Sequence, residues 1–89
     1  MKIRLELFGA SREFSNKDYL DFNINNKISI KDFRQEIINY IKLNFKDNKA
    51  FKKIVETSAF CTEDNNIIND NYKIIKNQKI TIIPPIGGG

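Results

Sequence analysis

Histidine is absent from this 89-residue chain, and cysteine occurs only once, at Cys61. The usual zinc sites need clusters of these two residue types, and a Ser-His or Cys-His nucleophile pair needs a histidine. We therefore expect no metal site, and we expect any covalent chemistry at a group other than the usual catalytic side chains. A single cysteine cannot form a disulfide within the chain, which favours a cytoplasmic location.

Long apolar runs are also missing. No segment approaches the ~18 apolar residues that a membrane-spanning helix needs. The first residues, MKIRLELF, carry a charge at every second position, unlike the apolar core of a signal peptide. From this pattern we expect no membrane partner.

Arginine is scarce although the chain is basic. It has 15 Lys and Arg against 11 Asp and Glu, a net charge of +4, and only three of the basic residues are arginines. Nucleic-acid interfaces usually combine arginines with exposed aromatic side chains. The lysines gather in the segments 42–53 and 73–79, which is typical of a solvated surface. We therefore expect no nucleic-acid partner.

The rest of the composition is that of one small globular domain, with 40% hydrophobic and 29% charged residues. Alternating apolar residues predict strands over 2–8 and 19–24, and the short connection between them predicts an antiparallel hairpin. Further strands are expected within 51–62, with a brief apolar segment at 67–68 and a final strand at 80–83.

One helix is predicted over residues 29–45. Ser29 followed by Asp32 is typical of an N-cap with an acidic residue in the first turn. Apolar residues recur at steps of three and four and form one stripe, made of Ile30, Phe33, Ile37 and Ile41. Because this stripe and the strand faces must bury each other, we predict an α+β fold of order β-β-α-β-(β)-β, with the last strand parallel to the first.

Glycine and proline are rare as well, and five of the six occur in the last six residues, PPIGGG. Pro84 and Pro85 lack N–H donors and end the sheet ladder. The six residues after Ile83 can reach about 20 Å when extended, and glycines can pass through a channel too narrow for other side chains. We predict a domain over 1–83 and a tail over 84–89 that enters a partner with its carboxylate leading. The alternative is a frayed terminus without a function.

Three segments carry a resemblance to a known family. The ending ITIIPPIGGG, the segment LFGASREF (7–14) and the approach YKIIKNQKITIIPP (72–85) resemble the small sulfur-carrying subunit of molybdopterin synthase, the MoaD-like group. This group lies within the MoaD/ThiS ubiquitin-like β-grasp proteins. The resemblance covers nearly the whole chain and implies a β-grasp fold, a mixed sheet packed on one main helix.

The resemblance also implies a chemistry. A ubiquitin-activating-like adenylyltransferase would use ATP to adenylate the carboxylate of Gly89, and a sulfurtransferase would then supply sulfur to form a thiocarboxylate. The acceptor would be a pterin precursor on the large catalytic subunit of molybdopterin synthase, in a heterotetramer. Tail insertion would involve Pro84, Pro85, Ile86, Gly87 and Gly88. The chain itself would be an accessory subunit with no bound cofactor, not a catalyst on its own.

A partner interface is predicted beside the tail. Alternation along the two strands turns Phe8 and Ile83 away from the helix, so they would form an apolar patch if the strands are neighbours. The resemblance adds Phe60 to the patch, and it gives Arg12 a role in contacting a partner or bracing the base of the tail. The alternatives are that Phe8 tucks under its own loop and that Arg12 is solvated or makes a hydrogen bond within its loop.

Three other functions stay open. The sulfur could go to another acceptor, such as the thiamine thiazole or a tRNA. The chain could be a ubiquitin-like modifier joined through Gly89 to a target lysine. It could also be a binding module with an inert tail. The two prolines before the glycines favour the molybdopterin reading over ThiS-type carriers.

Overall fold

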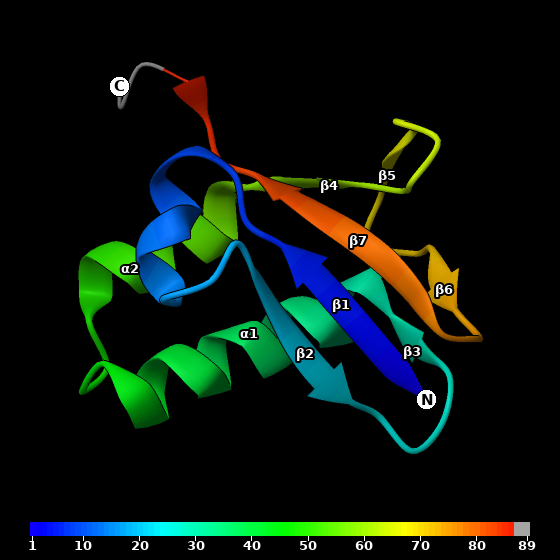
Figure 1. The fold of residues 1–89 in the computed structure, drawn as a ribbon, viewed down its shortest axis with the longest axis horizontal. Helices are drawn as coiled ribbons and strands as arrows, with labels where there is room; N and C mark the ends of the chain where they lie inside the picture. The colour runs from blue at the N-terminus through cyan, green and yellow to red at the C-terminus, as the bar shows by residue number, and fades with distance from the viewer. Residues whose placement is uncertain (87–89) are drawn as a thin grey trace.

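The computed structural model describes residues 1–86. A five-stranded sheet has the strand order β2-β1-β7-β4-β5, and the long helix α1 crosses one of its faces (Figure 1). A second, two-stranded sheet pairs β3 with β6. The strands are β1 (Lys2–Glu6), β2 (Tyr19–Asn23), β3 (Ile28–Ser29), β4 (Ala59–Cys61), β5 (Ile67–Ile68), β6 (Lys73–Ile74) and β7 (Gln78–Ile83). The helices are η1 (Gly9–Phe14), α1 (Ile30–Asn44) and α2 (Lys49–Thr57).

The strand directions agree with the sequence pattern. β1 and β2 form the predicted antiparallel hairpin, with Leu5 opposite Leu20. β7 lies parallel to β1, with Leu5 beside Ile80, as a helical crossover between them requires. β7 is therefore an inner strand, bonded to β1 on one side and to β4 on the other. The α+β prediction is confirmed.

Helix α1 begins where the sequence indicates. The Oγ of Ser29 accepts a hydrogen bond from the backbone N–H of Asp32 at 3.1 Å, which satisfies one of the free donors of the first turn. The predicted stripe is fully buried against the sheet. The burial of this stripe holds the helix to the sheet, and the positions between the stripe residues are largely polar.

The predicted strand over 51–62 is wrong in its first half. Residues Lys49–Thr57 form the helix α2, and only Ala59–Cys61 form a strand. The side chain of Asn48 accepts a hydrogen bond from the N–H of Phe51 at 3.1 Å and caps the helix. Phe51, Ile54 and Val55 follow a helical spacing of three and four, and they pack toward the core. The segment has too few apolar residues to distinguish the period of two of a strand from the period of 3.6 of a helix without this tertiary contact.

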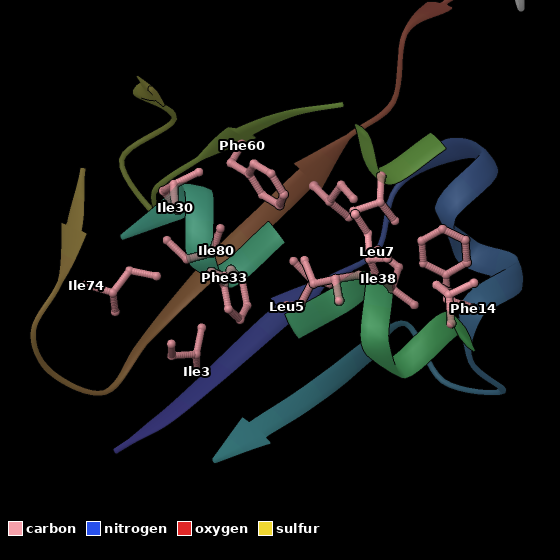
Figure 2. Close-up of a cluster of buried hydrophobic side chains, with 14 residues drawn as sticks. Ile3, Leu5, Leu7, Phe14, Ile30, Phe33, Ile38, Phe60, Ile74 and Ile80 are labelled. Carbon is pink, nitrogen blue, oxygen red and sulfur yellow. The ribbon is translucent and has the colours of Figure 1, made fainter. Parts of the chain in front are cut away.

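The core lies between the sheet and the helices α1 and α2. Figure 2 shows side chains from both layers converging on it, with Leu5 and Ile80 from the sheet facing Phe33 and Ile38 from α1. Phe33 packs edge-on against Phe22 at a ring distance of 5.4 Å. Within residues 1–86, every buried side-chain nitrogen or oxygen has a hydrogen-bond partner. The domain is therefore a well-packed, rigid support for the end of β7.

Candidate functional site

The candidate site begins where β7 ends. β7 stops at Ile83, where it still pairs with Ala59 of β4. Pro84 is buried, whereas Pro85 is exposed and Ile86 is 96% exposed. The predicted tail residues Gly87, Gly88 and Gly89 lie outside the described residues. The described part of the tail thus has a fixed root at Pro84 and a free apolar side chain two residues later.

An apolar patch lies next to this root on the outer face of the sheet. In the parallel register of β1 and β7, Glu6 lies beside Thr81. Two residues further along both strands, the same register brings Phe8 beside Ile83. Phe8 has extended backbone angles (φ −140°, ψ 144°), so the strand alternation continues to it. Its side chain is 55% exposed and does not tuck under its own loop. Ile83 is half-buried, and Ala59 lies beside it in the row.

The predicted position of Phe60 in this patch is wrong. Phe60 pairs with Ile82, an inward residue, and its side chain is fully buried. Figure 2 shows it projecting from β4 into the core, where its ring lies 6.3 Å from that of Phe33. Because alternate residues face opposite sides of a strand, Ala59 takes the outward position instead. The outer patch is therefore made of Phe8, Ile83 and Ala59.

The 3-10 helix η1 holds Phe8 in place, and Ser11 is a residue that sequence reasoning missed. The fully buried Ser11 accepts a hydrogen bond from the N–H of Phe8 at 2.8 Å and donates one to the Phe8 carbonyl at 2.7 Å. Gly9 has a φ of +56°, a conformation that glycine adopts readily, and it starts the turn. A small polar residue shortly after the strand was the available signal, since such residues commonly bond to nearby backbone.

Helix α1 fixes the other end of η1. The Tyr40 hydroxyl donates a hydrogen bond to the carbonyl of Phe14 at 2.8 Å, and burial raises the pKa of this phenol. Phe14 is fully buried and its ring lies 5.2 Å from that of Phe51 on α2. The segment that carries Phe8 is thus anchored at both ends, so the patch is preorganised.

Arg12 is exposed on η1. Among residues 1–86 its side chain makes no hydrogen bond or ion pair by the usual distance criteria. A partner contact for Arg12 stays a prediction.

The rest of the outer face is polar. Arg4 donates two hydrogen bonds to Asp21, at 2.9 and 3.1 Å, and its guanidinium lies 3.9 Å above the ring of Tyr19. These hydrogen bonds lower the pKa of the Asp21 carboxyl. Lys79 and Glu6 form a longer ion pair at 3.7 Å. The charges on this part of the face are thus largely paired, and the outer face consists of this polar part and the apolar patch next to it.

The described part of the chain offers little for chemistry by side chains. Residues 1–86 contain no group of three His, Cys, Asp or Glu side chains placed to hold a metal ion. Cys61 is buried. No helix among these residues is long and apolar enough to cross a membrane. What the arrangement provides is a well-packed domain with an apolar patch beside the start of the tail at Pro84.

The topology defines the class of fold. One main helix crosses a mixed sheet whose inner strands β1 and β7 are parallel, and the chain leaves the sheet at the end of β7. This is the ubiquitin-like β-grasp fold, in the form that small MoaD-like proteins have.

Three solved structures show this similarity. SAMP1 from Haloferax volcanii matches with a TM-score of 0.69 and 9% identity over all of both chains. A putative molybdopterin converting factor, subunit 1, from Pyrococcus furiosus matches with a TM-score of 0.67 and 15% identity, over 96% of this chain and 98% of that one. Caldiarchaeum subterraneum ubiquitin matches with a TM-score of 0.60 and 15% identity, over 100% and 98%. No family model and no curated protein matches the sequence.

Proposed function

We propose that this protein is a sulfur carrier whose C-terminal Gly89 is adenylated and converted to a thiocarboxylate. One observation carries the proposal: the segment Pro-Pro-Ile-Gly-Gly-Gly continues from an inner strand of a β-grasp domain, with a buried root at Pro84 and an exposed Ile86. A chain built this way can deliver its terminus into another protein's active site while the domain docks outside.

The proposed reaction has two stages. A carboxylate oxygen of Gly89 attacks the α-phosphorus of ATP on the adenylyltransferase, and pyrophosphate leaves. The persulfide sulfur of a sulfurtransferase then attacks the acyl carbon, AMP leaves, and a second thiol cleaves the resulting acyl disulfide to free the thiocarboxylate. An ionised carboxylate is a poor electrophile, which is why activation must come first. The carrier supplies reach and docking, while its partners supply the catalytic groups.

Molybdopterin biosynthesis is the pathway that we propose for the sulfur. The Pyrococcus furiosus protein of the same fold is described as subunit 1 of a molybdopterin converting factor, so that protein belongs to a factor with more than one subunit. We propose that the present chain likewise docks on a large catalytic subunit, in a heterotetramer. Phe8, Ile83, Ala59 and Arg12 would form the contact, and the tail would enter the large subunit's active site.

A ubiquitin-like modifier is the second candidate, favoured by the similarity to Caldiarchaeum subterraneum ubiquitin. The two functions share the acyl adenylate and differ in what attacks it, a persulfide or a lysine amine.

Intact mass spectrometry tests the proposal. The purified protein is incubated with ATP, a ubiquitin-activating-like enzyme from the same genome and a sulfurtransferase with its sulfur donor. A mass gain matching the replacement of one oxygen by sulfur at Gly89 is expected. Conjugates to lysines would support the modifier instead. No change with any activating enzyme of that genome would contradict both.

A further inference from the structure

A second surface adjoins the tail root, on the helix side of the sheet. A hollow lies between η1, helix α2 and the start of the tail, and its lining includes Ala10, Ala50, Lys53, Ile54, Pro84 and Pro85. Figure 1 shows η1, α2 and the end of β7 at the same end of the molecule. Pro84 follows Ile83, which faces outward, so strand alternation turns Pro84 toward the helices. The hollow and the Phe8 patch therefore flank the tail from opposite sides of the sheet.

Helix α2 builds the floor and rim of this hollow. Ala50, Lys53 and Ile54 are three and four residues apart and share one helix face. Val55 lies on the face that is buried in the core. Ala50 is exposed and Ile54 is half-buried, so the apolar side chains are accessible to an incoming group. The small side chains of Ala10 and Ala50 leave this space open.

The charge near the hollow is mainly positive. Among residues 1–86, Lys53 is the only charged residue in its lining. Helix α2 carries two further cations, Lys49 and Lys52, against one acidic residue, Glu56. Among residues 1–86 none of the three lysines takes part in an ion pair, whereas Arg4, Arg34 and Lys79 all do. The hollow therefore fits an apolar side chain that has a carboxylate next to it.

We propose that the adenylyltransferase which activates Gly89 fills this hollow with an apolar side chain and pairs a neighbouring carboxylate with Lys53. This inference rests on the proposed function. An activating enzyme that takes up the Gly89 carboxylate contacts the tail, and the first two tail residues, Pro84 and Pro85, are part of the hollow's wall. Contact on this side is thus continuous with contact along the tail. The activating enzyme is also the one partner that the carrier and modifier functions share.

Charge reversal tests the contact. ATP–pyrophosphate exchange is measured with the ubiquitin-activating-like enzyme from the same genome, at increasing concentrations of carrier. Lys53→Glu is expected to raise the KM for the carrier about tenfold with kcat nearly unchanged, because it puts a like charge against the partner's carboxylate. Lys49→Glu, on the same helix but outside the lining, makes the same charge change and is expected to raise KM less than about twofold. Lys53→Arg is expected to keep KM near that of the wild type.

A second variant tests the apolar part. Ala50→Glu places a bulky charged group in the hollow, and the KM for the carrier is expected to rise. Because Ala50 is at an exposed helix position, the fold is expected to be retained, and circular dichroism and thermal unfolding check it. The KM of the wild type is also expected to increase with salt, and this dependence is expected to weaken in Lys53→Glu.

Equal KM values for Lys53→Glu and Lys49→Glu, with normal exchange by the wild type, would overturn the inference and leave the proposed function standing. An unchanged KM in Ala50→Glu would likewise overturn the apolar contact. Absence of exchange with the wild type itself would overturn the proposed function and, with it, this inference.

Discussion

At the scale of single residues, Arg34 in a polar stretch of α1 is largely buried and links three segments of the fold. Its guanidinium donates to the carbonyls of Val55 and Ser58, both at 2.8 Å, and to Asp70 at 2.9 Å. It also lies 4.7 Å above the ring of Phe60. One planar side chain thus joins α1, the end of α2 and the loop before β6, and it satisfies carbonyls that a helix end leaves free.

Arg34→Lys is expected to lower the free energy of unfolding by about 2 kcal/mol, because an ammonium group cannot reproduce the forked geometry and leaves carbonyls without partners. Urea denaturation followed by circular dichroism measures the change. Arg12→Lys, at an exposed position without such bonds, serves as the control. A loss below about 0.5 kcal/mol for Arg34→Lys would show that water replaces these bonds at little cost.

Two phenylalanines near the tail separate docking from packing. Phe60→Ala is expected to destabilise the domain by about 3–5 kcal/mol because it leaves a cavity in the core. Phe8→Ala removes a half-exposed ring and is expected to cost less than about 1 kcal/mol. Thermal unfolding of both variants gives the comparison. If Phe8→Ala proved as destabilising as Phe60→Ala, the outer patch would be part of the fold and not a free surface.

At the scale of elements, α2 is where periodicity alone misled. The short apolar segment with Phe51, Ile54 and Val55 was compatible with a strand as well as with a helix. The Asn48 cap and the packing on α1 and η1 decide that it is helical. In contrast, α1 has four evenly spaced apolar residues over three turns and a Ser29 cap, so the sequence pattern was sufficient there.

Asn48→Ala is expected to reduce the stability of the domain by about 1 kcal/mol, since the first turn of α2 loses its side-chain acceptor. Chemical denaturation measures this loss, and amide exchange of residues 51–55 shows whether it is local. Asn39→Ala, at an exposed position within α1, is the matched control and is expected to be close to neutral. Equal stability of both variants would mean that packing alone holds α2.

At the scale of the whole molecule, the core and the exposed part of the tail occupy separate parts of the chain. Among residues 1–86 the side chains of the hydrophobic core lie between Ile3 and Ile82, and the chain is exposed from Pro85 onward to Ile86. The outer patch and the hollow beside α2 flank the point where the chain leaves. The fold thus places two separate surfaces around the root of the tail at Pro84.

Deleting Gly88 and Gly89 is expected to change the free energy of unfolding by less than about 0.5 kcal/mol, because the core of residues 1–86 is built from side chains between Ile3 and Ile82. The same deletion is expected to abolish the mass gain on incubation with ATP, activating enzyme and sulfur donor. Thermal unfolding and intact mass spectrometry measure the two effects. If the deletion protein still gained sulfur, the group that accepts sulfur would lie elsewhere than at Gly89, contrary to the proposed function.

The sequence by itself determined the strands β1, β2 and β7, the helix α1 and the outward positions of Phe8 and Ile83, because alternation and helical spacing are local properties that the buried faces enforce. It also concentrated proline and glycine at one end. Only the tertiary structure decided that residues 49–57 are helical, that Phe60 faces the core and Ala59 the patch, and that Ser11, Arg34 and Lys53 occupy their positions. These outcomes depend on contacts between segments far apart in the chain, and no local pattern encodes which neighbour a short apolar run will meet.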